Sequence, residues 1–137
     1  MREVIRARGH EHVAATHQST FEVTTDDWLT PAGDCIVGID ADRAPADFDD
    51  DFVTACRDPE ATITLTLETA DAREEVRARG HPDLTFESDR SAVVRTSTYV
   101  DDRTVAVGAD AAAAGLNREL VAALADGTDL TLTLTVE

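Results

Sequence analysis

Lysine is absent from this chain of 137 residues, so all 12 basic side chains are arginine, against 28 aspartates and glutamates and a net charge of −16. Such an acidic excess normally excludes nucleic acid and anionic membranes as partners. The acids are spread along the chain, and aromatic residues make up only 4% of it. This pattern is typical of a protein kept soluble in concentrated salt, where the Debye length shrinks to about 3 Å. The acidity therefore reports the habitat more than the partner, and nucleic acid is not indicated.

Long apolar runs are lacking too. No stretch approaches the roughly 18 apolar residues of a membrane span, and the N-terminus lacks the apolar run of a signal peptide. We therefore expect a cytoplasmic protein without a membrane partner. The only two cysteines, Cys35 and Cys56, match no zinc or redox spacing and are expected to be reduced and buried. Phosphate-binding glycine loops and the common hydrolase motifs are also absent, so no motif assigns an enzyme class.

What the chain does have is a repeat. The pentapeptide RARGH occurs at residues 6–10 and again at 77–81. Farther on, ADRAPADFDDDFVTAC (41–56) aligns with ADAAAAGLNRELVAAL (109–124), and ATITLTLE (61–68) aligns with LTLTLTVE (130–137). The sequence therefore predicts a single domain, 1–137, made of two duplicated repeats of about 1–69 and 70–137.

Each repeat is expected to be rich in strands with one helix. The strict alternation of threonine with aliphatic residues at 62–68 and 130–137 predicts strands with one face on a core. Apolar spacing in 41–56 and 109–124 predicts helices, with Pro45 in a first turn and Gly127 after a last one. We predict a mainly β (α+β) fold, a small pseudo-twofold β-barrel whose ends the helices cap, because closure removes exposed edges. An open α+β sandwich is the alternative.

The repeated pentapeptide is a candidate anion site. In a strand, residues two apart share a face, so Arg6, Arg8, His10 and His12 form one row, and Arg77, Arg79 and His81 repeat it. Guanidinium groups bind carboxylate or phosphate in a bidentate manner, and two symmetric rows suit a ligand on the axis between the repeats. Cross-strand pairing with acidic residues, together with a bend that needs glycine before each histidine, explains the same rows without a ligand.

Three of the four histidines, His10, His12 and His17, lie in RGHEHVAATHQST (8–20). Three imidazoles around an open position would suit a divalent, zinc-like metal that lowers the pKa of a bound water. His81 could join them or form a separate half-site. Hydrogen-bonded histidines near a hairpin are the simpler interpretation. The hydroxyls of this stretch could likewise hold a polar ligand or complete a turn; they belong to Thr16, Ser19 and Thr20.

The stretches RARGHEHVAATHQSTFEVTTDDWLTPAGDCIVGIDADRA and RGHPDLTF…RTVAVGADAAAAGLNRELV resemble an archaeal family known as domain of unknown function 371. The resemblance implies an archaeal cytosolic protein, haloarchaeal given its acidity, and no assigned activity. His12 stands where the family pattern has asparagine. This moves the metal hypothesis to His10, His17 and His81, with Glu11 or Asp34 as the general-base candidates. The residues that fit the family pattern are Gly9, His10, Glu11, Thr16, His17, Thr20, Phe21, Pro31, Gly33, Asp34, Cys35, Asp42 and Arg43.

Three functions follow as hypotheses, and the sequence leaves open whether the protein is an enzyme. The first is a binding module for a small anionic ligand, with Arg8, His10, Thr16, His17, Thr20, Arg79 and His81 as the ligand-binding candidates. The second is a metal-assisted, histidine-ligated enzyme. The third is a structural or regulatory protein whose polar β face pairs with another chain. A homodimer is expected only from the frequency of dimers among small proteins.

Overall fold

The computed structural model describes all residues from 1 to 137. The first half contains four strands, a 3₁₀ turn and a helix, namely β1 (Arg2–Arg8), β2 (Thr20–Thr24), β3 (Ile36–Gly38), η1 (Pro45–Asp47), α1 (Asp50–Cys56) and β4 (Thr62–Glu68). The second half has the same order of elements, namely β5 (Arg73–Arg79), β6 (Ser91–Arg95), β7 (Thr104–Ala106), η2 (Ala113–Gly115), α2 (Arg118–Ala125) and β8 (Asp129–Val136). No helix has the length and apolar character needed to cross a bilayer.

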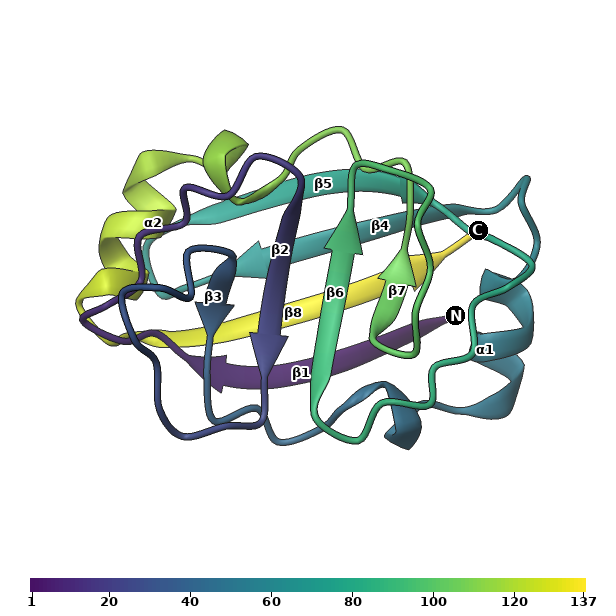
Figure 1. The fold of residues 1–137 in the computed structure, drawn as a ribbon, viewed down its shortest axis with the longest axis horizontal. Coiled ribbons are helices and arrows are strands. Elements are labelled where there is room, and N and C mark those ends of the chain that lie inside the picture. Colours follow the sequence, from purple (N-terminus) through teal and green to yellow (C-terminus); the bar gives the residue numbers. More distant parts are fainter.

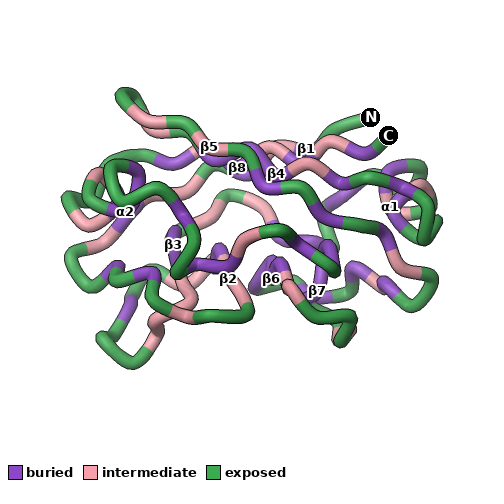
Figure 2. Tube along the Cα trace, turned by 90° about the horizontal axis from the view of Figure 1, so that it is seen from above, coloured by how far each residue is buried: buried purple, intermediate pink, exposed green.

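The strands form two separate four-stranded sheets that lie face to face (Figure 2). Sheet A has the order β1-β8-β4-β5 and sheet B the order β3-β2-β6-β7. The strands of sheet B cross those of sheet A steeply, and the two helices lie at opposite ends of the sandwich (Figure 1). The fold is therefore α+β and mainly β, as the sequence predicts, and each half of the chain contributes strands to both sheets.

The predicted closed barrel is wrong, and the open sandwich describes the fold. The sheets meet at two corners through single bridges, Arg8 with Ile39 and Arg79 with Val107. Farther along the edge of β1, the Arg6 amide donates to the Asp42 carboxylate at 2.8 Å instead of to another strand. Because the three-residue strands β3 and β7 are too short to continue the ladder, these loop contacts cover the edges without closing a barrel.

One hydrophobic cluster of 33 buried residues fills the space between the sheets and draws on both halves. In β8 the leucines Leu130, Leu132 and Leu134 are buried, whereas the threonines between them face outward and are half-buried. The helices are shorter than their apolar spacing predicts, because a 3₁₀ turn and a capping residue, Asp49 or Asn117, precede each one. Pro45 opens the first of these 3₁₀ turns and not, as predicted, the first turn of the helix itself.

The strands β4 and β8 correspond at a different offset from the predicted one. Gly9 donates its amide to Thr128, and Gly80 donates to Ala61. These two acceptors are 67 residues apart, whereas the sequence match of 61–68 with 130–137 implies 69. A strict alternation has a period of two, so a slip by two residues keeps every side chain on its face and leaves the sequence pattern equally satisfied.

The repeated Arg-Gly-His segment joins each half to the helix of the other half. The His10 amide donates to the carbonyl of Leu124 in α2 at 2.9 Å, and the His81 amide donates to the carbonyl of Cys56 in α1 at 3.0 Å. A Cβ atom on Gly9 would lie 1.9 Å from the Leu124 oxygen, and one on Gly80 would lie 2.2 Å from the Cys56 oxygen. Only glycine allows this approach, which satisfies carbonyls that a helix leaves unpaired at its C-terminus.

Replacing either glycine should therefore destabilise the whole protein. We expect Gly9→Ala and Gly80→Ala each to lower the free energy of unfolding by about 3 kcal/mol, because the new methyl group meets rigid backbone. Gly115→Ala is the matched control, since its Cβ would meet only the Ala111 side chain at 3.4 Å. Chemical denaturation followed by circular dichroism measures all three. Equal stabilities for the three variants would contradict the close approach.

Candidate functional site

The two arginine rows lie on the outer face of sheet A, at its two opposite edges. β1 and β5 are separated by β8 and β4, which places their backbones about 14 Å apart at ordinary strand spacing. Successive strands in this sheet are antiparallel, so Arg8 and Arg79 also lie at opposite ends of it. One small anion on the axis between the halves therefore cannot contact both Arg8 and Arg79. The structure provides two separate corners instead of one shared site.

His10 and His81 serve the turns that follow β1 and β5. The Nδ1 atom of His10 accepts from the His12 amide at 3.0 Å, and Nδ1 of His81 accepts from the Asp83 amide at 3.0 Å. Their backbone amides are used by the helix contacts described above. His10 is therefore held beside α2, and His81 beside α1 at the other end of the molecule (Figure 1).

His17 has an equivalent in the second half that is not a histidine. Its Nδ1 accepts from the amides of Ser19 and Thr20 at 3.2 and 3.1 Å. In the second half, the Ser88 hydroxyl accepts from the amides two and three residues later at 3.2 and 3.1 Å. The backbone of His17 accepts from Ala114, just as Ser88 accepts from Ala46. An imidazole and a hydroxyl thus perform the same structural task.

The structure does not assemble the predicted three-histidine centre. No three histidine, cysteine, aspartate or glutamate side chains are placed to hold one metal ion. Glu11 and Thr16 are exposed. Asp34 contributes its backbone carbonyl to the Thr16 and His17 amides. Thr20 lies with its hydroxyl 3.2 Å from His17 Nδ1, so it belongs to the same turn.

We expect His17→Ser to keep the stability of the protein within about 0.5 kcal/mol, because serine is the residue that serves this turn in the second half. His17→Ala should cost about 1 to 2 kcal/mol, since it leaves two amides without their acceptor. Urea denaturation at neutral pH compares the two. A serine variant as unstable as the alanine variant would show that the imidazole has a further role.

The outer face of sheet A gathers the arginines that have no partner. Eight of the 12 arginines donate a side-chain hydrogen bond within the protein, namely Arg8, Arg43, Arg57, Arg73, Arg90, Arg95, Arg103 and Arg118. The remaining four make neither a side-chain hydrogen bond nor an ion pair, and all four are exposed on β1 or β5. They are Arg2, Arg6, Arg77 and Arg79. Acids outnumber bases more than two to one in this chain, so four unpaired cations on one face of a sheet stand out.

The corners next to Arg8 and Arg79 correspond to each other but differ in charge. At the first corner, Asp40 pairs with Arg8 Nε at 3.2 Å. At the second, the equivalent position is Gly108, and both positions have the same left-handed φ of 59°. A Cβ on Gly108 would lie 3.8 Å from Arg79 Cδ. Arg79 therefore lacks the carboxylate that its counterpart has.

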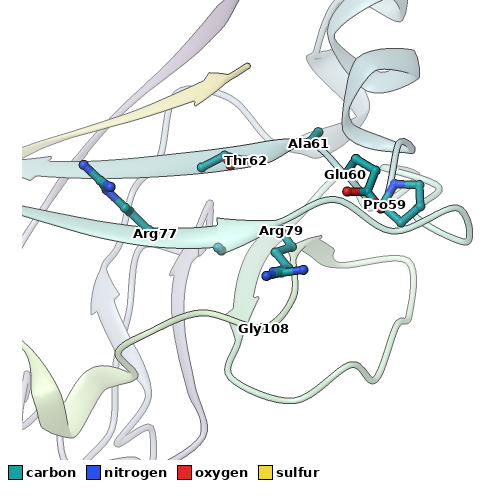
Figure 3. A pocket seen from close by; sticks show the side chains of 8 residues that line it. Pro59, Glu60, Ala61, Thr62, Arg77, Arg79 and Gly108 are labelled. Carbon is teal, nitrogen blue, oxygen red and sulfur yellow. The ribbon is translucent and has the colours of Figure 1, made fainter.

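The depression at the second corner has a volume of 290 Å³ (Figure 3). It is lined by Pro59, Glu60, Ala61, Thr62, Arg77, Ala78, Arg79 and Gly108. Thr62 stands where the first corner has Asp129, so two acids of the first corner are absent from the second. Glu60 is the one acid in the lining, and it forms no ion pair with either arginine. Of this corner, sequence reasoning identified Arg79 and missed Gly108 and Thr62, although aligning the halves puts Gly108 opposite Asp40.

The outer side of sheet B, by contrast, has its charges paired. Asp101 accepts from Arg95 at 3.0 Å and from Arg103 at 3.1 Å. Partial burial favours the neutral form of Asp101, but hydrogen bonds from Arg103 and Thr104 and the charge of Arg95 outweigh it and lower its pKa to about 2.

Burial, with Glu22 nearby, raises the pKa of Cys35 to about 11, and burial raises that of Cys56 to about 12. Both thiols are free and neutral at physiological pH; Cys56 is buried, as expected, whereas Cys35 is only half-buried.

The lowered pKa of Asp101 predicts a pH dependence. An ionised Asp101 stabilises the fold above its unfolded pKa of about 3.9, and this contribution is lost as the pH falls through the folded pKa of about 2. We expect Asp101→Asn to be less stable than the wild type at pH 7 and the difference to shrink between about pH 4 and pH 2. Denaturation of both proteins across this range measures it. A difference independent of pH would contradict the ion pairs.

Comparison with known proteins places the chain in a family. Residues 5–137 match the family described as a domain of unknown function, DUF371. The chain belongs to this family. It is 38% identical over 130 residues to an uncharacterized protein of Methanocaldococcus jannaschii, an alignment that covers 95% of this chain and 96% of the relative. The family and its archaeal relative agree with the resemblance of the sequence motifs, whereas a haloarchaeal origin stays a prediction.

Proposed function

We propose that this DUF371 protein binds a small anion, a phosphate or carboxylate group, at the corner of sheet A formed by Arg79, Thr62 and Gly108. The proposal narrows the predicted Arg-Gly-His site to one of its two copies and leaves the histidines outside it, since their Nδ1 atoms and amides serve the turns and helix ends. It assigns no metal and no reaction.

The main support for this proposal is that the arginine at one corner is paired with a carboxylate, whereas the arginine at the other corner is not. Arg8 holds the Asp40 carboxylate at 3.2 Å, and this ion pair shows what fits beside an arginine at that place in the fold. At Arg79 the carboxylate is missing, because Gly108 occupies the corresponding position in the same backbone conformation. An incoming anion would take the place that the Asp40 carboxylate fills in the other half. Guanidinium and carboxylate or phosphate are geometrically matched for this contact.

The proposal treats the two halves as copies of one unit, with bounds near 1–69 and 70–137. Support comes from the common order of elements and from the reciprocal contacts of Gly9 with α2 and Gly80 with α1. In that interpretation Asp40 occupies the place beside Arg8 in the first copy, and the corresponding place beside Arg79 in the second copy can accept a ligand. A cytoplasmic location remains part of the proposal.

The test is a titration with inorganic phosphate at constant ionic strength, followed by the NMR signals of residues 60–62, 77–79 and 108. We expect saturable shifts confined to this corner in the wild type. Gly108→Asp should raise the dissociation constant about tenfold or more, because the new carboxylate pairs with Arg79 as Asp40 pairs with Arg8. Aspartate already occurs at this φ in the first half, so the variant should fold.

Asp40→Gly is the matched control, because it removes an acid at the equivalent place in the other half. It should leave phosphate binding at Arg79 at least as strong as in the wild type. Shifts spread evenly over all exposed arginines, or the same affinity in Gly108→Asp as in the wild type, would overturn the proposal.

A further inference from the structure

We infer that the ligand carries several anionic groups in a chain, and that it extends from Arg79 past Arg77 and across the threonines of sheet A to Arg2. The chemical class is a linear polyphosphate-type anion without an aromatic ring. This inference rests on the proposed function, since its first anionic group occupies the Arg79 corner.

First, the guanidinium groups of Arg77 and Arg79 extend in different directions from β5. Figure 3 shows Arg79 pointing toward Gly108, whereas Arg77 extends over the other side of β5, toward β4. The two side chains share the outer face of sheet A but lean toward opposite edges of β5, so they would hold different groups of a ligand. Arg77 also lines a second depression, of 370 Å³, on the outer face of sheet A. Glu68, Glu75 and Glu137 are the acids in the lining of this second depression.

The second step is the strand register. Arg2 pairs with Thr135, Thr135 with Thr64, and Thr64 with Arg77, so one row crosses all four strands of sheet A. Residues in such a row point to the same face. The row thus has an unpaired arginine at each edge and two threonine hydroxyls between them. Arginine side chains that lean inward over the threonines would meet an anion lying across the sheet.

The counterpart of this row, near the other end of sheet A, contains an acid and is called the blocked row. It runs from Arg6 through Thr131 and Glu68 to Arg73. Glu68 stands where the open row has Thr135, and its carboxylate lies 3.9 Å from Arg73. Arg73 is further occupied by Glu75 at 2.8 Å. Gly108 and Thr135, both in the second half, are therefore neutral where the first half has Asp40 and Glu68. Both positions lie along the proposed path from Arg79 to Arg2.

The third step excludes ligands that need a stacking surface. No hydrophobic residue lines the 370 Å³ depression, and only Ala61 and Ala78 do so at the Arg79 corner. The one tryptophan and the one tyrosine, Trp28 and Tyr99, lie in the loops of sheet B. Single-stranded nucleic acid is bound through aromatic platforms as well as cations. An anion without bases therefore fits this face better.

The experiment compares tripolyphosphate with inorganic phosphate by calorimetry at one ionic strength. We expect the wild-type protein to bind tripolyphosphate at least tenfold more tightly, because it gains the second and third contacts. Arg2→Gln and Thr135→Glu should each remove most of this advantage without changing the phosphate affinity. Arg6→Gln is the matched control: it removes another exposed arginine from the same strand and face, but from the row that contains Glu68, and should leave the advantage in place.

The two failures can be distinguished. Loss of phosphate binding at the Gly108-dependent corner would overturn the proposed function together with this inference. Phosphate binding at the corner with no tripolyphosphate advantage, or an advantage that Arg2→Gln and Arg6→Gln reduce equally, would overturn the extended path alone. Tighter binding of oligo(dT) than of tripolyphosphate, lost in Arg2→Gln, would assign the face to single-stranded nucleic acid instead and would also overturn it.

Discussion

The close approach of Gly9 to α2 and of Gly80 to α1 is the constraint on which the rest of the structure depends. Each contact satisfies a helix C-terminus, ends an edge strand and starts the turn that leads to sheet B. The contacts are reciprocal, because each half supplies the glycine for the helix of the other half. Neither half can complete its own helix end, so the two halves form one hydrophobic core.

This constraint also explains the repeated pentapeptide. The glycine and the histidine amide are architectural, and the imidazole Nδ1 holds the following turn. Only the arginines remain free to act on something outside the protein. Arg6 and Arg77, equivalent to each other, and Arg79 have no partner, whereas Arg8 is paired with Asp40. The two copies of the pentapeptide therefore make the same structural contacts, but their arginines have different neighbours on the outer face of sheet A.

Much of the fold could be predicted from the sequence, and the errors have identifiable causes. Alternation located the strands, since a half-buried strand imposes a period of two. The same alternation could not fix the register of β4 against β8, because a slip of two residues preserves it. The barrel failed because closure depends on the short β3 and β7, whose pairing leaves no sequence signal. The prediction of one ligand site shared by both arginine rows was wrong, because β1 and β5 are antiparallel strands at opposite edges of sheet A. Arg8 and Arg79 therefore lie at opposite corners of the sheet.

The candidate site results from a difference between corresponding positions at the two corners of sheet A. At the corner next to Arg8, acids stand at Asp40 and Asp129, and Asp40 pairs with the arginine. At the corner next to Arg79, Gly108 and Thr62 stand there instead, and the row leading to Arg2 carries Thr135 where its counterpart carries Glu68. An acidic protein can hold an anion only where its own carboxylates are withheld, because each nearby carboxylate competes for the same guanidinium group. Gly108, Thr62 and Thr135 are neutral at three such positions, while Glu60, Glu68, Glu75 and Glu137 flank them in the lining of the two depressions. The arginines of sheet B, by contrast, are paired.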